Sequence, residues 1–311
     1  MAEDIESISV AEFVKKLSDT KSISNKINKL LLSDLVSKYG CQLTQGVELW
    51  QEATNLTSII STGCAEIDKL LDGGIFTGEL TEIFGPPACG KTQFAFSVTA
   101  NALLSNSFNV FYYDGCGTFS SKRIQEILNA QNECDRISPI TLKEIFSKLC
   151  CVKVFDIFDL ISHLETIKEK LIIGTDQFVL QTKLIIVDSI HSIISPVLGG
   201  KQNQGHALMI KVSLILKELA YVYGVAIITI NGTVSSKVNT DSFGSKFKPA
   251  LGKHWLVVPH VRLFSDFSSR KNINLRSMTI HKHVRLPIAK SKTFFQIEKF
   301  GLTGRMESKG S

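Results

Sequence analysis

The sequence lacks the features that mark several common protein classes. No apolar run in its 311 residues approaches the roughly 20 residues that a membrane-spanning helix needs. Residues 1–4 (MAED) are acidic, unlike the start of a secretory signal peptide. The seven cysteines include no C-x-x-C pair, and the chain holds neither an internal repeat nor a long low-complexity tract. These absences predict a soluble globular protein with reduced thiols, in the cytosol or the nucleus.

Charge is unevenly distributed along the chain. The net charge is +6, yet residues 231–311 hold ten lysines and five arginines against four carboxylates, a net of +11. The first 230 residues therefore carry a net of −5. A basic C-terminal third on a mildly acidic body indicates a surface for a polyanion such as nucleic acid. An ordinary solvated charged surface explains the same charges equally well.

One stretch carries a complete phosphate-binding motif. It fits the pattern G-x-x-x-x-G-K-[ST] with the residues Gly85, Pro86, Pro87, Ala88, Cys89, Gly90, Lys91 and Thr92. The two glycines let backbone N–H groups turn inward and approach a phosphate closely. The lysine can reach the β- and γ-phosphates, and the threonine hydroxyl can bind Mg²⁺. The motif predicts a site for a nucleoside triphosphate with Mg²⁺.

The surrounding residues predict an α/β fold. Residues 80–84 indicate a buried strand before the loop, and Thr92 opens a predicted helix. Further strands are expected at residues 110–113, 151–155, 184–187 and 225–230, with a helix along 208–222. Alternating strands and helices favour a mostly parallel central sheet with helices on both faces. The strand of residues 184–187 ends at Asp188, in the crevice where such sheets bind ligands, so Asp188 is a second candidate Mg²⁺ ligand.

The chain before the core predicts a separate module. Ser9 and Glu12 have the spacing of a capping box, and Gly40 stands where a second helix would end. Residues 1–48 are therefore expected to form a small helical domain, 49–60 a linker, and 61–311 the ATPase core. Nothing in the first 48 residues indicates catalysis.

With these motifs in place, residues 56–300 resemble the RecA-like recombinases of eukaryotes and archaea. The resemblance rests on Thr62-Gly63, Asp68, Gly78-Glu79, the phosphate loop and Asp188-Ser189. Residues 195–200 (SPVLGG) and 248–255 (KPALGKHW) are most similar to the D-type paralogue of the strand-exchange recombinase. The resemblance implies a RecA-type P-loop ATPase core behind a helical domain, ATP and Mg²⁺ as cofactors, and homologous-recombination repair of DNA in the nucleus.

Two positions depart from the family pattern. Cys116 stands where active recombinases have a glutamate that polarises the attacking water, and a thiol is mostly protonated at neutral pH and a poor base. Gly232 stands where relatives have a glutamine that senses the γ-phosphate. Both changes predict a site that binds ATP but hydrolyses it slowly. Asp114 is a possible substitute base, so no catalytic residue is assigned firmly.

The resemblance also implies contacts with adenine, DNA and other subunits. Arg123 matches an arginine that stacks on adenine, although an exposed helix arginine is the alternative. Two family loops that face single-stranded DNA correspond to residues 199–205 and 232–248. The candidate DNA-binding residues in or beside them are Lys201, Lys237, Lys246, Lys248 and Lys253. The segment 50–53 (WQEA) loosely resembles the aromatic-x-x-Ala plug with which recombinases join the next subunit's sheet edge.

Two functions fit these observations. The first is a paralogue subunit, a weak DNA-dependent ATPase that binds single-stranded or branched DNA within a heteromeric complex. The resemblance places it between the C-type paralogue and the small X-ray-repair cross-complementing paralogue, with the B-type paralogue at the far end. The second is an autonomous DNA-stimulated ATPase that forms its own filament and exchanges strands. The departures at Cys116 and Gly232 favour the first, and the intact phosphate loop supports the second.

Overall fold

The computed structural model describes residues 44–104, 108–131, 137–199, 204–235, 247–269, 272–288 and 292–305. The chain divides into two compact units, residues 1–55 and 56–311. The described part of the first unit holds helix α3 (Gly46–Leu56), on which Val47 and Trp50 are exposed. The predicted helical domain of residues 1–48 lies almost wholly outside the described residues. The predicted linker, 49–60, contains most of α3 and the short strand β1 (Ile59–Ile60).

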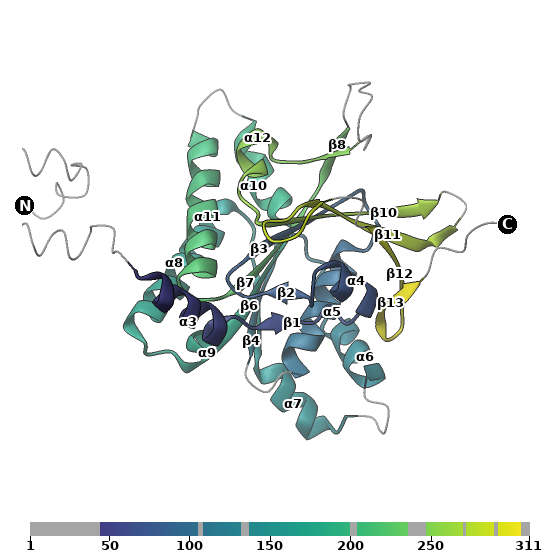
Figure 1. The fold of residues 1–311 in the computed structure, drawn as a ribbon, viewed down its shortest axis with the longest axis horizontal. Helices are drawn as coiled ribbons and strands as arrows, with labels where there is room; N and C mark the ends of the chain where they lie inside the picture. Colours follow the sequence, from purple (N-terminus) through teal and green to yellow (C-terminus); the bar gives the residue numbers. More distant parts are fainter. Residues whose placement is uncertain are drawn as a thin grey trace, which may run out of the picture. The chain divides into compact units, whose positions relative to one another are not determined.

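The second unit is built around a nine-stranded sheet in the order β13-β12-β11-β10-β3-β7-β6-β4-β5 (Figure 1). The six strands from β10 to β5 run parallel, and β11, β12 and β13 continue the sheet antiparallel. The strand bounds are β3 Leu80–Phe84, β4 Asn109–Asp114, β5 Leu149–Lys153, β6 Thr182–Asp188, β7 Ala226–Asn231, β10 Val261–Ser269, β11 Asn272–Lys282, β12 Lys292–Glu298 and β13 Gly301–Arg305. The predicted mostly parallel sheet is confirmed.

Helices cover both faces of this sheet (Figure 1). One face carries α4 (Ala65–Leu70), α5 (Lys91–Leu104), α6 (Ser121–Gln131) and α7 (Pro139–Ser147). The other carries α8 (Ile157–Ile173), α9 (Gln177–Leu180), α10 (Ile190–Leu198), α11 (Gln204–Tyr221) and α12 (Gly252–Leu256). Within the described residues, none of the helices combines the length and apolar character needed to cross a membrane.

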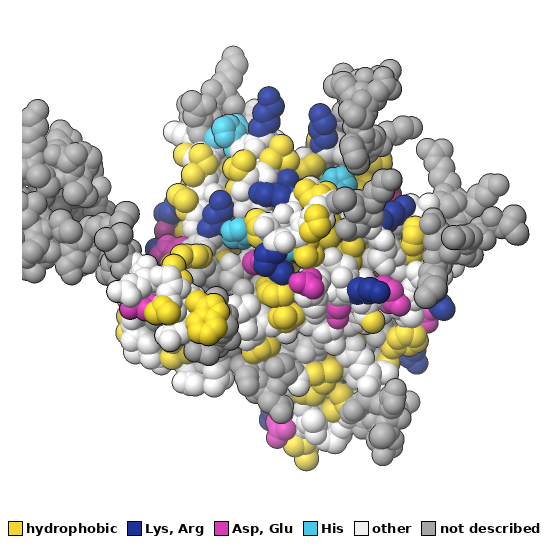
Figure 2. Space-filling model, in the orientation of Figure 1, with side chains coloured by type: hydrophobic (Ala, Val, Ile, Leu, Met, Phe, Trp, Pro, Cys, Tyr) yellow, Lys and Arg dark blue, Asp and Glu magenta, His cyan; other side chains and the backbone are white. Residues whose placement is uncertain are grey.

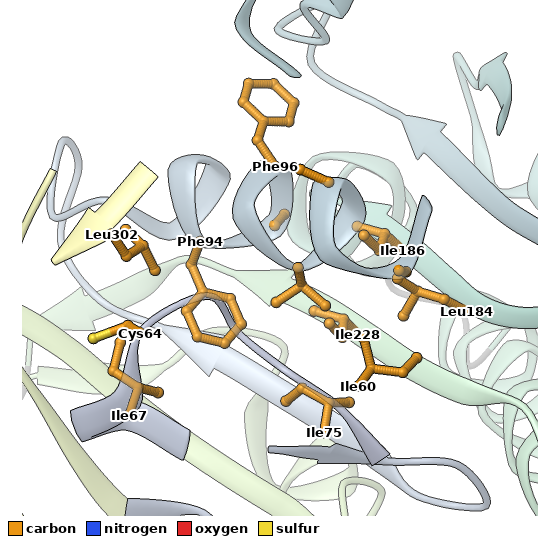
Figure 3. Packing of buried hydrophobic residues seen from close by; sticks show 14 of the residues in the cluster. Ile60, Cys64, Ile67, Ile75, Phe94, Phe96, Leu184, Ile186, Ile228 and Leu302 are labelled. Atoms are coloured by element: carbon orange, nitrogen blue, oxygen red, sulfur yellow. The ribbon is translucent and has the colours of Figure 1, made fainter. Parts of the chain in front are cut away.

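The central strands are mainly apolar because both of their faces are buried. Along β6, Leu184 and Ile186 enter the core under α5, whereas Ile185 and Val187 enter the core under α10 and α11. Figure 3 shows the first of these cores, where Phe94 of α5 points down toward Ile67 and Ile75. The phosphate-loop helix is thereby fixed to the sheet through its own apolar side.

Two local expectations were wrong in detail. The strand expected at residues 151–155 is β5, which ends at Lys153, and Phe155 is 85% exposed. It ends there because the Asp156 carboxylate caps α8 by accepting hydrogen bonds from the N–H groups of Phe158 and Asp159. The segment 232–248, read as a loop, begins and ends in strands: β8 (Thr233–Ser235) pairs antiparallel with β9 (Phe247–Pro249).

A buried carboxylate joins three strands of the sheet and helix α12 around the phosphate loop. Glu82 of β3 is fully buried and forms an ion pair with Arg262 of β10, its parallel neighbour. Its Oε1 also accepts hydrogen bonds from Asn231 Nδ2 at 2.7 Å and from Trp255 Nε1 at 2.9 Å. Arg262 in turn donates to the carbonyl oxygen of Leu256 at 3.1 Å. The cluster of Glu82, Asn231, Trp255 and Arg262, called the Glu82 cluster below, is therefore a connected buried network in which the Glu82 carboxylate is paired, while Asn231 Oδ1 has no hydrogen-bond partner within the described part of the chain.

We expect Glu82→Gln to lower the free energy of unfolding by about 3–5 kcal/mol, because the amide leaves the Arg262 charge buried without a counter-ion. Chemical denaturation followed by circular dichroism measures the change. The matched control is Glu298→Gln, which breaks the more exposed pair with Arg305 and should cost less than about 1 kcal/mol. Equal losses for the two variants would contradict a central role for Glu82.

Candidate functional site

The phosphate loop joins β3 to α5 in a conformation that needs its glycines. A Cβ on Gly85 would collide with the carbonyl oxygen of Ser265, so the strand β10 leaves no room for a side chain. Gly90 has φ +99°, and a Cβ there would lie 2.9 Å from Ile297 Cδ1. Ala88 also has positive φ, at 62°. The neighbouring strands β10 and β12 therefore approach the loop so closely that only glycine fits at positions 85 and 90.

Lys91 is held over the centre of this loop. Its ammonium donates to the carbonyl oxygens of Gly85 and Pro86, both at 2.8 Å. The backbone of α5 starts at the same residue, and Phe94 N–H donates to the Gly90 carbonyl at 2.9 Å. A point charge and a helix N-terminus therefore meet in one loop, an arrangement that binds phosphate.

Thr92 and Asp188, 96 residues apart in sequence, meet beside the loop. The Asp188 carboxylate accepts a hydrogen bond from the Tyr112 hydroxyl at 2.9 Å, and the Thr92 hydroxyl lies close enough to act on its pKa. Burial raises the pKa of Asp188 from its ordinary value, and the Thr92 and Tyr112 hydroxyls oppose that rise. A hydroxyl and a carboxylate are the hard oxygen ligands that Mg²⁺ takes from proteins alongside water and phosphate. The two predicted metal ligands thus fit the ion.

The segment after β4 offers hydrogen bonds but no free carboxylate. Asp114 accepts the N–H groups of Cys116 and Thr118 through Oδ1, at 3.2 and 3.1 Å, and that of Phe119 through Oδ2, at 3.1 Å. These bonds hold the turn, a structural role for Asp114, and its use as a base stays a prediction. The exposed Cys116 Sγ lies 3.3 Å from Ser192 Oγ. Residue 116 thus presents a thiol beside a hydroxyl.

A pocket of about 410 Å³ opens beside the loop. Its lining residues are Ala88, Gly90, Lys91, Thr92, Gln93, Asn274, Arg276 and Ile297. The last three come from β11 and β12 and were missed from the sequence, where nothing in the local pattern marks them. The pocket joins the predicted phosphate loop to the antiparallel end of the sheet.

Arg123 lies next to this pocket rather than in its wall. Its guanidinium donates to Gln93 Oε1 at 2.8 Å and to the carbonyl oxygens of Glu298 and Lys299. Gln93 is itself a lining residue. Stacking of Arg123 on adenine stays a prediction, with the side chain held at the edge of the pocket.

Comparison with known proteins decides the family. A family model described as Rad51 matches residues 54–303 of the chain. The chain belongs to the Rad51 family.

Curated Rad51-family relatives cover most of the chain. It is 34% identical over 253 residues to DNA repair protein RAD51 homolog 4 of Mus musculus, covering 81% of this chain and 74% of that protein. It is 32% identical over 282 residues to the Bos taurus protein of the same name, covering 90% and 84%. A Dictyostelium discoideum protein, "Probable DNA repair protein RAD51 homolog 4", is 30% identical over 275 residues, covering 78% and 76%. The resemblance to the D-type paralogue is confirmed.

The second departure from the Rad51-family pattern has a clear packing consequence. A Cβ on Gly232 would lie 3.0 Å from Cδ2 of His191, so the imidazole fills the space into which a side chain at 232 would extend. The carbonyl oxygen of Gly232, just before β8, also accepts a hydrogen bond from the N–H of Ala250, just after β9, at 3.0 Å. A larger side chain at this position would therefore require the His191 ring to shift.

Two of the five candidate DNA-binding lysines lie within the described residues. Lys248 is exposed on β9, and Lys253 is exposed at the start of α12. Lys and Arg side chains gather on the upper part of the face in Figure 2, around α12 and β8, with histidines among them. Lys201, Lys237 and Lys246 lie outside the described residues.

We expect Lys91→Ala to abolish binding of ATP while leaving the melting temperature within a few degrees of wild type, because the hydrogen-bond partners of the ammonium, the carbonyl oxygens of Gly85 and Pro86 and the sulfur of Cys89, all belong to the phosphate loop itself. Isothermal titration calorimetry measures the binding, and thermal denaturation checks the fold. A variant that still binds ATP with wild-type affinity would contradict the assignment of the loop.

Proposed function

We propose that this chain is an ATP-binding and DNA-binding recombinase paralogue subunit that supports homologous-recombination repair in the nucleus. Membership of the Rad51 family and relatives named as DNA repair proteins support this role. The observation that carries it is the phosphate loop with Lys91, Thr92 and Asp188 assembled around it. These residues are suited to hold ATP with Mg²⁺.

The same site is proposed to hydrolyse ATP slowly. Phosphoryl transfer to water depends on a group that positions or deprotonates the water. Cys116 supplies an exposed thiol, and the Asp114 carboxylate already accepts three backbone N–H groups. Binding of ATP, with Mg²⁺ held by Thr92 and Asp188, would then promote assembly of the heteromeric complex, and the energy of ATP hydrolysis would matter less.

We expect purified wild-type protein to turn over ATP slowly, with little stimulation by single-stranded DNA, and Lys91→Ala to remove the remaining activity. Cys116→Glu should raise the rate by about tenfold or more, because a positioned base contributes roughly 10²–10⁴-fold. Phosphate release at saturating ATP measures all three. Fast, DNA-stimulated turnover by the wild type would instead favour an autonomous ATPase that forms its own filament and exchanges strands.

Heteromeric assembly is the second part of the proposal. The resemblance names the C-type paralogue and the small X-ray-repair cross-complementing paralogue as neighbours. The edge of the sheet at β5 supports docking, because an edge strand can accept a further strand from a partner. A pocket of about 230 Å³ lies beside it, with Phe111, Cys150 and Phe178 among its lining residues. The buried Tyr113 hydroxyl there has no hydrogen-bond partner within the described part of the chain.

DNA binding is proposed for the basic surface at β9 and α12. We expect Lys248→Glu combined with Lys253→Glu to weaken binding of single-stranded DNA, because two mobile cations no longer neutralise phosphates. The slope of log affinity against log salt should shrink by about 1.4, at about 0.7 per lost phosphate contact on a single strand. Fluorescence anisotropy across a salt series measures this.

Lys143→Glu is the matched control, since this exposed lysine lies on α7, away from β9 and α12. It changes the net charge by the same amount per residue without touching the proposed surface. A salt slope that is unchanged in the double variant, or that falls as much for Lys143→Glu, would remove Lys248 and Lys253 from the DNA contact.

A further inference from the structure

Arg276 lies against the phosphate loop although it follows that loop by more than 180 residues. It stands on β11, paired with Phe267 of β10 and Phe295 of β12. Its Cδ and Nε lie 3.2 and 3.4 Å from the position that a Cβ on Gly90 would occupy. The side chain therefore forms one wall of the 410 Å³ pocket.

The guanidinium of Arg276 lacks the carboxylate that every other described arginine has. Within the described residues, carboxylates lie within ion-pair distance of four arginines, namely Arg123, Arg262, Arg285 and Arg305. Arg276 has backbone carbonyls instead: Asn274 O at 3.1 Å and Ala88 O at 3.5 Å. Its Nε is buried and has no partner among the described atoms.

A partly buried cation without a paired anion is unfavourable by itself. Burial lowers the pKa of Arg276, which reflects the cost of keeping the charge out of water. The aromatic ring of Phe267, 5.7 Å from the guanidinium carbon, offsets part of that cost and orients the planar group. The open side of the guanidinium adjoins the loop residues Ala88 and Gly90. An anion bound in the loop is the partner that this geometry lacks.

We propose that Arg276 is a nucleotide-binding residue that contacts the phosphate chain from the β11 side of the pocket, across from Thr92 and Asp188. This inference rests on the proposed ATP binding and adds a residue to that site. The guanidinium presents several donors in a fixed plane, which suits the paired oxygens of a phosphate group. Nucleotide binding would also attach the antiparallel end of the sheet to the phosphate loop.

The test uses the full chain with Mg²⁺ and a fluorescent methylanthraniloyl derivative of ADP, displaced by ATP, ADP or inorganic tripolyphosphate. We expect Arg276→Gln to weaken binding of all of these about tenfold to a hundredfold, the usual effect of losing charge-assisted hydrogen bonds. Arg276→Lys keeps the charge but not the planar fork, and should give an intermediate loss. The matched control, Arg305→Gln, removes an exposed arginine of the same sheet and should bind as wild type does.

The outcomes separate this inference from the proposed function. Wild type that binds no nucleotide would overturn ATP binding itself, and the inference with it. Wild type that binds while Arg276→Gln binds equally well would overturn the inference alone. Weaker binding of nucleotides together with unchanged binding of tripolyphosphate would indicate that Arg276 contacts the base or the sugar, and would overturn the phosphate contact. Should Arg276→Gln unfold, as thermal denaturation would reveal, Arg276→Lys decides: wild-type affinity for tripolyphosphate overturns the contact, and weaker affinity supports it.

Discussion

The buried charge of Glu82 is the constraint on which the rest of the site depends. A fully buried carboxylate is tolerated only when its oxygens are paired, and here Arg262, Asn231 and Trp255 supply the partners. Each partner belongs to a different element: β10, the end of β7, and α12. Because Glu82 precedes the phosphate loop by three residues, the pairing that satisfies it also fixes the strand that presents the loop. The contacts that neutralise the charge of Glu82 are therefore the same contacts that hold β3, and with it the phosphate loop, in place.

The nucleotide site and the basic surface are connected by hydrogen bonds through Asn231 and Ala250. Asn231 ends β7 and donates both to Glu82 and to the carbonyl oxygen of Ala250. Ala250 in turn is bonded to Gly232, and Lys248 lies two residues before it on β9. The hairpin that carries a candidate DNA-binding lysine is therefore joined by hydrogen bonds to the strand of the phosphate loop. Such a connection suits a subunit in which nucleotide binding influences the proposed DNA contact.

The site is better equipped for holding a nucleotide than for hydrolysing one. Lys91, Thr92 and Asp188 are placed by the loop, the helix start and the end of β6, and Arg276 adds a cation from β11. The two positions at which the resemblance predicts groups that act on water hold Cys116 and Gly232, and the His191 ring lies 3.0 Å from the position that a Cβ on Gly232 would occupy. A Rad51-family chain that binds ATP but hydrolyses it slowly would suit the proposed supporting subunit, in which binding of ATP matters more than its hydrolysis.

The sequence by itself determined the phosphate loop, the apolar strands ending at Asp114 and Asp188, and the family, because these signals are local: consecutive motif residues and apolar runs that both faces of a sheet must bury. It misplaced the end of β5, since an apolar run does not reveal that Asp156 must be free to cap the next helix. Only the tertiary structure decided that Arg276 reaches the phosphate loop and that Glu82 is paired with Arg262. These contacts join residues separated by 180 positions or more, and strand order, which no local pattern specifies, brings them together.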